Sequence, residues 1–421
     1  MEESPSPVMS EKLRTEMGAA AVNAAKALAY DNAGTVEFIY DDSSGDFYFL
    51  EVNTRLQVEH PVTEEVTGLD LVQMQIESAQ GLPLSLVQKD IQGQGYALEA
   101  RLYAEDASND FLPVTGTIQR FEYPAVDGLR VETAIQSGSK ISVFYDPMIA
   151  KIIVHDASRA AVMRKMQYVL KNLVCQGMTT NQDFLLHMVE NAEFQAGKYN
   201  THFIKNKIDL ASIAIKDPND KALAGIAATL HGWQQRQNSR TLLRSIPSGW
   251  RNNFYEPQFE EYVMGETDWK IGYQSKGNQQ FEFYICEETY AVSLINADAQ
   301  QVRAEINGVQ YTFQLAQNGN DYFVHNERTG NISLSQKERF PEKEIAKVAG
   351  GYETPMPSQI IKVLVKAGQK VKSGEGLVIL SSMKMENTIE AVEDGVVEEV
   401  YATEGGNVEA GFLLLKLASE A

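Results

Sequence analysis

The 421-residue chain is long enough for two to four domains, and its 43% of apolar residues can fill ordinary hydrophobic cores. Its formal net charge of −20 argues against nucleic acid as the main partner, because phosphate binding needs clustered Lys and Arg. The opening stretch MEESPSPVMSEKLRTEM lacks the apolar core of a signal peptide, and no run of about 18 apolar residues follows it. The sequence therefore predicts a soluble intracellular protein that binds neither nucleic acid nor membrane.

The two cysteines give a further indication of the compartment. Cys175 lies in NLVCQGM and Cys286 in FYICEE, and both runs are apolar. We expect two buried free thiols in a reducing compartment rather than a disulfide.

The pattern of the first 210 residues predicts a mixture of helices and strands. Ser10 is expected to begin a helix rich in alanine. The strand-like runs GTVEFIY and DFYFLEVN follow, and further along the chain AAVMRKMQYVLKNLVC has helical periodicity. This pattern is typical of a mixed α and β domain.

Two glutamates face each other in the hairpin that these strand-like runs predict. Folding the chain about residue 44 places Glu37 opposite Glu51, to within one residue of register. Opposed carboxylates repel and need compensation. A divalent cation with oxygen ligands would supply it, as Mg²⁺ does when it also binds nucleotide phosphates. Two solvated glutamates on an exposed hairpin face remain the alternative.

Polar residues continue beyond the second strand of this hairpin. A period of two would place Glu51, Asn53 and Arg55 on one face, and the run EVNTRLQVEHPVTE continues through the polar residues Gln57, Glu59 and His60. Such a cluster between the apolar runs FYFL and VTGLDLVQM is poor core material unless it binds something. The run therefore predicts a ligand site.

The middle of the chain predicts one helix followed by a β-rich region. The helix is KALAGIAATLHGWQQRQ, and the β-rich region extends from about 248 to 335. Within it, Asn307-Gly308 stands between alternating runs, which is a strong hairpin signal. The charged stretch SQKERFPEKEIAKVAGG predicts a linker before the final module.

The final module contains an internal repeat. The pattern Gly-x-x-Val-x-x-Gly occurs first in GQKVKSG and again in GGNVEAG, each time between two β runs. Two such halves predict a flattened barrel of two sheets related by a pseudo-twofold axis. Lys384 lies in the connection between the halves, flanked by Met383 and Met385, so we expect it at an exposed hairpin tip. An ordinary turn lysine is the alternative to a carrier lysine.

The motifs PMPS and MKMEN in this double repeat resemble the biotinyl domain of biotin-dependent carboxylases. That resemblance implies biotin attached covalently to Lys384, between Met383 and Met385, by a biotin protein ligase. Lipoyl domains share the fold but usually have Asp-Lys-Ala at the tip. Ser382 and Ser358 depart from the usual alanine and glycine of the biotinyl family.

Residues 2 to about 208 resemble part of biotin carboxylase, an ATP-grasp enzyme, through EVNTRLQVEHPVTE, ALEARLYAEDASNDFLPVTG and YDPMIAKIIV. The resemblance implies Mg²⁺ or Mn²⁺ on ATP at Glu37, Glu51 and Asn53. It implies bicarbonate at Arg55, Gln57 and Val58, with Glu59 as the general base. Arg101 would stabilise the biotin enolate, although a strand-edge salt bridge with Glu99 is the alternative for this arginine. About half of the biotin carboxylase region, including its glycine-rich phosphate loop, is absent from the sequence, so we expect an incomplete active site.

The order of regions resembles the α subunit of acyl-CoA carboxylases of the propionyl-CoA or 3-methylcrotonyl-CoA type. In this family the β-rich insert is an antiparallel barrel around a helix that docks onto a carboxyltransferase β subunit, and Trp250 and Arg251 are either interface anchors or ordinary residues. The expected fold is multidomain α+β: an incomplete ATP-grasp carboxylase (1–208), a barrel-like docking domain (209–335), a linker (336–350) and a flattened β-barrel biotinyl domain (351–420).

The implied function is ATP- and bicarbonate-dependent carboxylation of biotin on Lys384 and delivery of carboxybiotin to the β subunit in a hetero-oligomer. The expected location is the bacterial cytoplasm, or the mitochondrial matrix in a eukaryote. The alternative is a carrier and scaffold subunit that performs no chemistry. The sequence does not identify the acyl-CoA.

Overall fold

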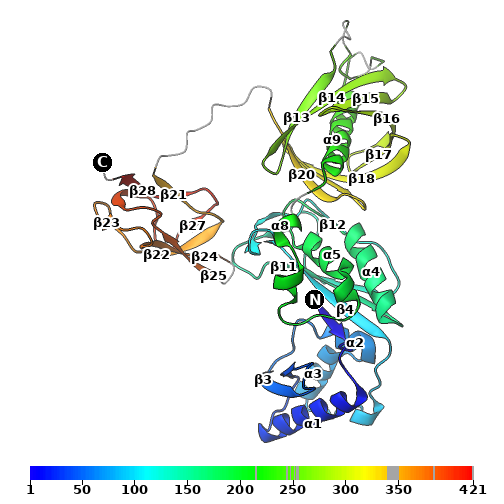
Figure 1. Cartoon of the computed structure of the whole chain (residues 1–421), viewed down its shortest axis with the longest axis vertical. Helices are drawn as coiled ribbons and strands as arrows, with labels where there is room; N and C mark the ends of the chain where they lie inside the picture. Colours follow the sequence, from blue (N-terminus) through cyan, green and yellow to red (C-terminus); the bar gives the residue numbers. More distant parts are fainter. Residues whose placement is uncertain are drawn as a thin grey trace.

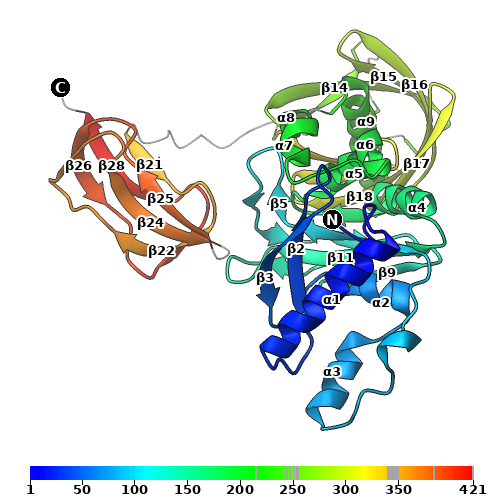
Figure 2. The same ribbon diagram turned by 60° about the horizontal axis from the view of Figure 1, so that its bottom comes forward.

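The computed structural model describes residues 1–213, 216–242, 245–246, 248–250, 252, 256–338, 350–382 and 385–419. Figures 1 and 2 show three modules in chain order: an N-terminal α/β module, a closed barrel that contains one helix, and a C-terminal module of two small sheets. Of the helices within these ranges, none has both the length and the apolar composition that a bilayer span requires.

The N-terminal module begins with a helix and a two-stranded hairpin. Ser10 caps the first helix, as predicted: its side chain accepts a hydrogen bond from the amide of Leu13 at 3.2 Å. The elements of this segment are β1 (Glu2–Ser4), α1 (Glu11–Ala27), β2 (Thr35–Tyr40), β3 (Phe47–Asn53), α2 (Pro61–Thr67), α3 (Leu71–Ala79) and the 3₁₀ turn η1 (Gln88–Asp90).

A four-stranded sheet in the order β1-β4-β11-β9 forms the centre of the N-terminal module. Its strands β4 (Tyr96–Tyr103), β11 (Met148–Asp156) and β9 (Leu129–Thr133) pair antiparallel with one another. One face is apolar and packs against α4 (Arg159–Asn172) and α5 (Gln182–Glu190), where Leu102 and Ile152 are fully buried. The alternate residues of β4 and β11 face the other side, which α2 covers.

Short elements complete the N-terminal module. They are β5 (Glu105–Asp106), β6 (Leu112–Pro113), β7 (Gly116–Thr117), β8 (Arg120–Glu122), β10 (Lys140–Ile141), β12 (Val174–Gln176), α6 (Ala192–Gln195), α7 (Phe203–Lys207) and α8 (Leu210–Ile213). Cys175 in β12 is a buried free thiol, as predicted, and burial raises its pKa to about 12.

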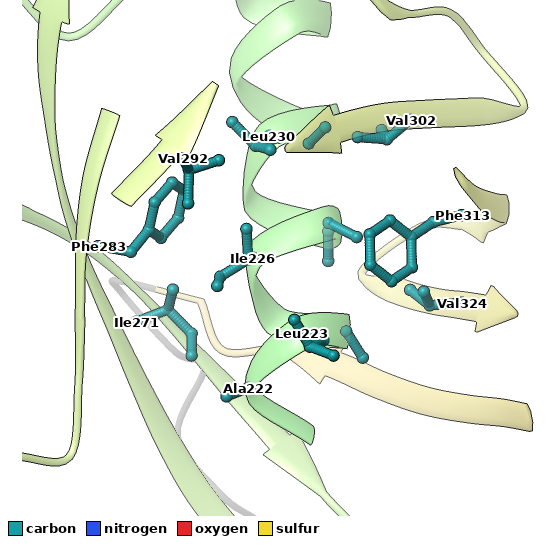
Figure 3. Packing of buried hydrophobic residues seen from close by; sticks show 14 of the residues in the cluster. Ala222, Leu223, Ile226, Leu230, Ile271, Phe283, Val292, Val302, Phe313 and Val324 are labelled. Atoms are coloured by element: carbon teal, nitrogen blue, oxygen red, sulfur yellow. The ribbon is translucent and has the colours of Figure 1, made fainter. Parts of the chain in front are cut away.

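The second module is an eight-stranded antiparallel barrel around α9 (Pro218–Ser239). Its strands are β13 (Gln258–Met264), β14 (Thr267–Gly277), β15 (Gln280–Ile285), β16 (Glu288–Ala297), β17 (Gln301–Ile306), β18 (Val309–Asn318), β19 (Asp321–Asn326) and β20 (Gly330–Gln336). Figure 3 shows Leu223, Ile226 and Leu230 of α9 among Phe283, Phe313 and other apolar side chains of the barrel wall. The barrel around a helix, which the resemblance implied, is therefore confirmed.

Two turns of the barrel contain residues for which the sequence made a specific prediction. Asn307 and Gly308 join β17 to β18 with φ of 51° and 81°, so the predicted hairpin turn is confirmed and both residues are left-handed. The prediction of a buried Cys286 is wrong, because this residue stands in the turn between β15 and β16 and is exposed.

Buried polar groups join the barrel to the N-terminal module. Gln176, which is 2% exposed, donates its side-chain amide to the backbone carbonyls of Gln314 and Phe323, at 3.0 Å each. Arg120 on β8 donates to the carbonyl of Gln300 at 2.7 Å. Because a buried amide without partners is costly, these bonds favour one arrangement of the two modules.

The C-terminal module consists of two four-stranded sheets, β21-β28-β26-β23 and β25-β24-β22-β27. The strands are β21 (Gly351–Glu353), β22 (Ser358–Val363), β23 (Lys370–Val371), β24 (Gly376–Ser382), β25 (Met385–Glu390), β26 (Gly395–Val400), β27 (Asn407–Val408) and β28 (Leu413–Ser419). The repeated glycines Gly368, Gly374, Gly405 and Gly411 all have φ between 79° and 84°, a conformation that favours glycine. The predicted flattened barrel with two similar halves is confirmed.

Candidate functional site

The paired glutamates lie where the hairpin predicts them. In the register of β2 and β3, Glu37 stands directly opposite Glu51, and a bulge follows Glu37. The side-chain amide of Asn53 donates to Glu37 Oε1 at 2.7 Å and to Glu51 Oε1 at 3.1 Å. Gln57 donates to the same oxygen of Glu37 at 2.9 Å. The hairpin therefore brings two carboxylates and two amides together.

The prediction of one continuous polar strand face beyond Asn53 is wrong. Strand β3 ends at Asn53, and residues 54–60 form an irregular segment that turns before α2. Pro61 stands at the start of α2, where its missing N–H costs nothing. His60 Nδ1 lies 2.7 Å from the carbonyl oxygen of Gln57, and this contact helps to close the turn.

The turn nevertheless brings Glu59 to Arg101. Glu59 Oε2 lies 3.9 Å from Arg101 Nη1, and the two side chains are 27% and 35% exposed. Arg101 projects from β4, and its guanidinium carbon lies 5.9 Å from the centre of the Tyr103 ring. A carboxylate and a guanidinium thus meet at an accessible position beside the glutamate pair.

The alternative partner for Arg101 was Glu99, which is two residues away on the same strand face. Glu99 is fully buried, and neither of its carboxylate oxygens has a hydrogen-bond partner in the described part of the chain. Burial raises the pKa of Glu99 to about 7, and the nearby charge of Lys151 opposes this rise. The described ion pair of Arg101 is with Glu59.

The other predicted residues lie on the same turn. Arg55 is exposed, and its Nη1 donates a long hydrogen bond of 3.4 Å to the carbonyl of Leu56. The carbonyl of Val58 accepts a hydrogen bond from Lys151 Nζ at 3.1 Å. Arg55 therefore presents its guanidinium to solvent beside Gln57 and Glu59.

A network of charged side chains that the sequence did not predict lies beneath this turn. Lys151 on β11 pairs with Glu132 on β9, and Arg130 pairs with Glu132 as well. Arg130 also reaches Glu64 of α2 at 2.9 Å. The signal available in the sequence was a single lysine within the apolar strand run MIAKIIV.

The donor set at the hairpin suits a hard divalent cation. Glu37, Glu51 and the amide oxygen of Asn53 are oxygen ligands of the kind that Mg²⁺ prefers, and Mg²⁺ commonly takes one or two carboxylates together with substrate phosphates. The described residues contain no group of three or more His, Cys, Asp or Glu side chains that could hold a metal ion. Any cation at the hairpin would therefore need further oxygen ligands, such as those of a phosphate group.

The predicted carrier lysine belongs to the C-terminal module. Lys384 and Met383 lie outside the described residues, and Met385 is the first residue of β25. Ser382 pairs with Met385 across the two strands. Ser382 and Ser358, which differ from the usual residues of the biotinyl family, both hydrogen-bond to the PMPS segment. The Ser382 hydroxyl donates to the carbonyl of Pro357 at 3.0 Å, and the Ser358 hydroxyl donates to the carbonyl of Met356 at 2.9 Å. Both serine hydroxyls therefore have hydrogen-bond partners close to the β24–β25 connection.

Three family models match sections of the chain. "Carbamoyl-phosphate synthase L chain, ATP binding domain" matches residues 1–87, and "Biotin carboxylase C-terminal domain" matches residues 99–206. "Biotin-requiring enzyme" matches residues 352–417. The first two matches contain the hairpin, the turn and Arg101, and the third contains Lys384.

Relatives match the whole chain. The chain is 36% identical over 439 residues to the mitochondrial methylcrotonoyl-CoA carboxylase subunit alpha of Rattus norvegicus, covering 100% of this chain and 60% of the rat protein. It is 32% identical over 436 residues to the propionyl-CoA carboxylase alpha chain of Ruegeria pomeroyi, covering 97% of this chain and 64% of that protein. The chain thus spans about three fifths of the length of these relatives.

A solved structure also resembles the chain. The complete multifunctional pyruvate carboxylase from Rhizobium etli has a TM-score of 0.50 and 33% sequence identity, covering 54% of this chain and 23% of that one. Along its whole length the chain is similar to the alpha subunits of methylcrotonoyl-CoA and propionyl-CoA carboxylases, and its three family matches are to an ATP-binding domain, a biotin carboxylase C-terminal domain and a biotin-requiring enzyme.

Proposed function

We propose that this chain belongs to a carboxylase that uses ATP and bicarbonate to carboxylate biotin held on Lys384. The observation that carries the proposal is the 3.9 Å contact between Glu59 and Arg101 beside the opposed pair Glu37 and Glu51. The proposal gives Glu59 the role of the base, Arg101 that of a fixed cation, and Glu37 and Glu51 that of metal ligands. The chain spans about three fifths of the length of the rat relative, so the carboxylase activity of a whole protein of this kind is itself part of the proposal.

The hairpin would bind the metal and the nucleotide phosphates. Glu37, Glu51 and Asn53 are the residues that would hold Mg²⁺ or Mn²⁺, which neutralises phosphate charge when it is bound. The two amides that already donate to Glu37 support this role, because they fix the carboxylate orientation.

The turn at residues 54–60 would bind and activate bicarbonate. The guanidinium of Arg55 suits a planar anion, and Gln57 and the backbone at Val58 lie next to it. Glu59 would take the proton of bicarbonate while a bicarbonate oxygen bonds the γ-phosphorus of ATP and ADP leaves. The product of this step, carboxyphosphate, breaks down to CO₂ and phosphate.

Arg101 would stabilise negative charge on the group that receives CO₂. Biotin, when attached at Lys384, supplies a ureido ring whose deprotonated form needs a fixed cation nearby. Arg101 lies at the outer end of a rigid strand and remains 35% exposed, so a tethered ring could reach it.

We also propose the domain layout and the partners. The layout is a carboxylase region at 1–208, a docking barrel at 209–335, a linker at 336–350 and a biotinyl domain at 351–420. The relatives are named as alpha subunits, which implies assemblies of several subunits. We propose a carboxyltransferase β subunit as partner and a biotin protein ligase as modifying enzyme. Trp250, 55% exposed, supports a docking role for the barrel, and Arg251 lies outside the described residues.

The relatives' names also bear on location. The rat protein is named as mitochondrial, and the Ruegeria protein is bacterial. We propose the mitochondrial matrix or the bacterial cytoplasm for this chain, according to its source.

Bicarbonate-dependent ATP hydrolysis tests the proposal. The chain would be extended by the region of the rat relative that its alignment leaves unmatched, and hydrolysis would be measured with and without free biotin. We expect an activity that Glu59→Gln and Arg101→Ala each lower by at least about 10²-fold, because each removes a base or a charge at the reaction centre. Glu16→Gln, on the exposed side of α1, is the control. An extended, folded protein that hydrolyses no ATP would favour the alternative of a non-catalytic biotin carrier.

A further inference from the structure

Lys151 occupies a central position beneath the turn that carries Arg55, Gln57 and Glu59. It lies on β11 directly opposite Arg101 of β4 on one side and Glu132 of β9 on the other. Its side chain is 11% exposed and pairs with the Glu132 carboxylate. A lysine so nearly buried needs such a partner, and Glu132 supplies it.

The ammonium also reaches across to the turn. Lys151 Nζ donates to the carbonyl oxygen of Val58 at 3.1 Å, and Val58 is the residue before Glu59. Residues 54–60 belong to neither a strand nor a helix, because β3 ends at Asn53 and α2 begins at Pro61. The bond from Lys151 therefore ties the irregular turn to the central sheet.

The neighbouring helix is tied down separately. Arg130 on β9 pairs with Glu64 at 2.9 Å and Glu65 at 3.2 Å, both on α2. Arg130 and Lys151 share Glu132, so one carboxylate orders both cations. Removal of Lys151 would leave the Arg130 pairs with α2 in place and would take from the turn its hydrogen bond to β11.

We propose that Lys151 is a positioning residue that holds the Val58 carbonyl so that Glu59 faces Arg101. The expected effect on catalysis rests on the proposed function, whereas the expected effect on the turn rests on the Lys151–Val58 hydrogen bond alone. A hydrogen bond donated by a charged ammonium is stronger than one between neutral groups, so it holds the backbone carbonyl more firmly than a neutral donor would. Arg101 and Lys151 are cross-strand neighbours, which places the two ends of this arrangement on the same rigid sheet.

Amide hydrogen exchange on the 421-residue chain tests the structural claim. The amides of His60 and Val62 bond the carbonyls of Gln57 and Glu59 and so report whether the turn is closed. In Lys151→Met we expect these amides to exchange at least about 10-fold faster, because the turn loses one hydrogen bond from a charged donor. Lys151→Arg, which keeps a cationic donor, should restore much of the protection.

The chain offers a matched control. Lys165 is 15% exposed, pairs with Asp156 at 2.8 Å and donates to the carbonyl of His155 at 2.8 Å, away from the turn. Lys165→Met should leave exchange at His60 and Val62 unchanged. Should Lys151→Met fail to fold, Glu132→Gln loosens the same ammonium and should give a smaller increase at the same amides. Unchanged exchange at His60 and Val62, or equal acceleration throughout β4 and β11, would overturn the proposal.

Kinetics of the extended protein test the chemical consequence. A displaced base lowers the rate of the chemical step more than it lowers nucleotide binding, so Lys151→Met should lower kcat about 10²-fold with little change in the KM for ATP. An unchanged kcat would refute the positioning role. If the extended wild-type protein is inactive, the proposed function fails, whereas the exchange result still decides whether Lys151 holds the turn.

Discussion

Glu99→Gln tests the electrostatics of the central sheet. Glu99 is fully buried on β4, and its oxygens have no hydrogen-bond partner within the described ranges. The charged groups that act on it are Lys151 and Arg101, which favour its ionised form, and Glu59 and Glu132, which oppose it. Glu2 stands opposite Glu99 on β1.

The magnitude follows from the pKa. Burial raises the pKa of Glu99 from 4.5 to about 7, so the folded protein holds this proton more tightly than the unfolded chain does. The native state therefore loses stability as the pH rises from about 4.5 through 7. A shift of this size corresponds to about 3 kcal/mol as an upper bound. The neutral amide that Glu99→Gln introduces does not titrate, so the substitution removes this loss.

We expect the free energy of unfolding of Glu99→Gln, relative to that of the wild type, to be larger at about pH 8 than at about pH 4.5, by up to about 3 kcal/mol. The three tryptophans lie at 233, 250 and 269, outside the N-terminal module, so fluorescence would report the barrel instead. Hydrogen exchange of β4 and β11 in increasing urea is the appropriate measurement. Glu16→Gln on the exposed side of α1 is the control. A relative stability that is the same at both pH values, or greater at the lower pH, would refute the reasoning.

Three further predictions concern other regions of the chain. Gln176→Ala should remove the side-chain donor to the carbonyls of Gln314 and Phe323 and lower the free energy of unfolding by about 1–3 kcal/mol. In urea the barrel and the N-terminal module should then unfold in two separate transitions, and a single unchanged transition would contradict this. Gly308→Val should destabilise the barrel by about 1–2 kcal/mol in tryptophan-detected unfolding, because Gly308 has φ of 81°; equal stability would show that the turn tolerates a side chain. The 421-residue chain alone should show no bicarbonate-dependent ATP hydrolysis above background, because its sequence contains no glycine-rich phosphate loop between a strand and a helix; hydrolysis that Glu59→Gln abolishes would prove this wrong.

Local signals in the sequence predicted local structure well. The Ser10 cap, the Glu37–Glu51 register and the Asn307-Gly308 turn each depend on residues that are close in the chain, and each is confirmed. The prediction that the polar strand face continues after Asn53 was wrong, because periodicity alone cannot show where a strand ends. Pro61 marks the start of the next helix and was the available warning.

Long-range pairing could not be predicted from the sequence. Glu59 meets Arg101 because the turn lies against β4, and Lys151 lies beside Arg101 and reaches Val58 because β11 pairs with β4 in one particular register. Nothing in the run MIAKIIV specifies that register. Cys286 was misjudged for a related reason: its apolar neighbours belong to a strand, while the cysteine itself occupies the turn that follows.

Intact-mass measurement after co-expression with a biotin protein ligase tests the central claim most directly. The resemblance of the C-terminal module to biotinyl domains predicts one added biotin on the wild-type chain, and none on Lys384→Arg. Lys372→Arg, in the turn between β23 and β24, should keep the modification. Lipoate at Lys384, biotin on a different lysine, or an unmodified chain in the presence of active ligase would contradict the account.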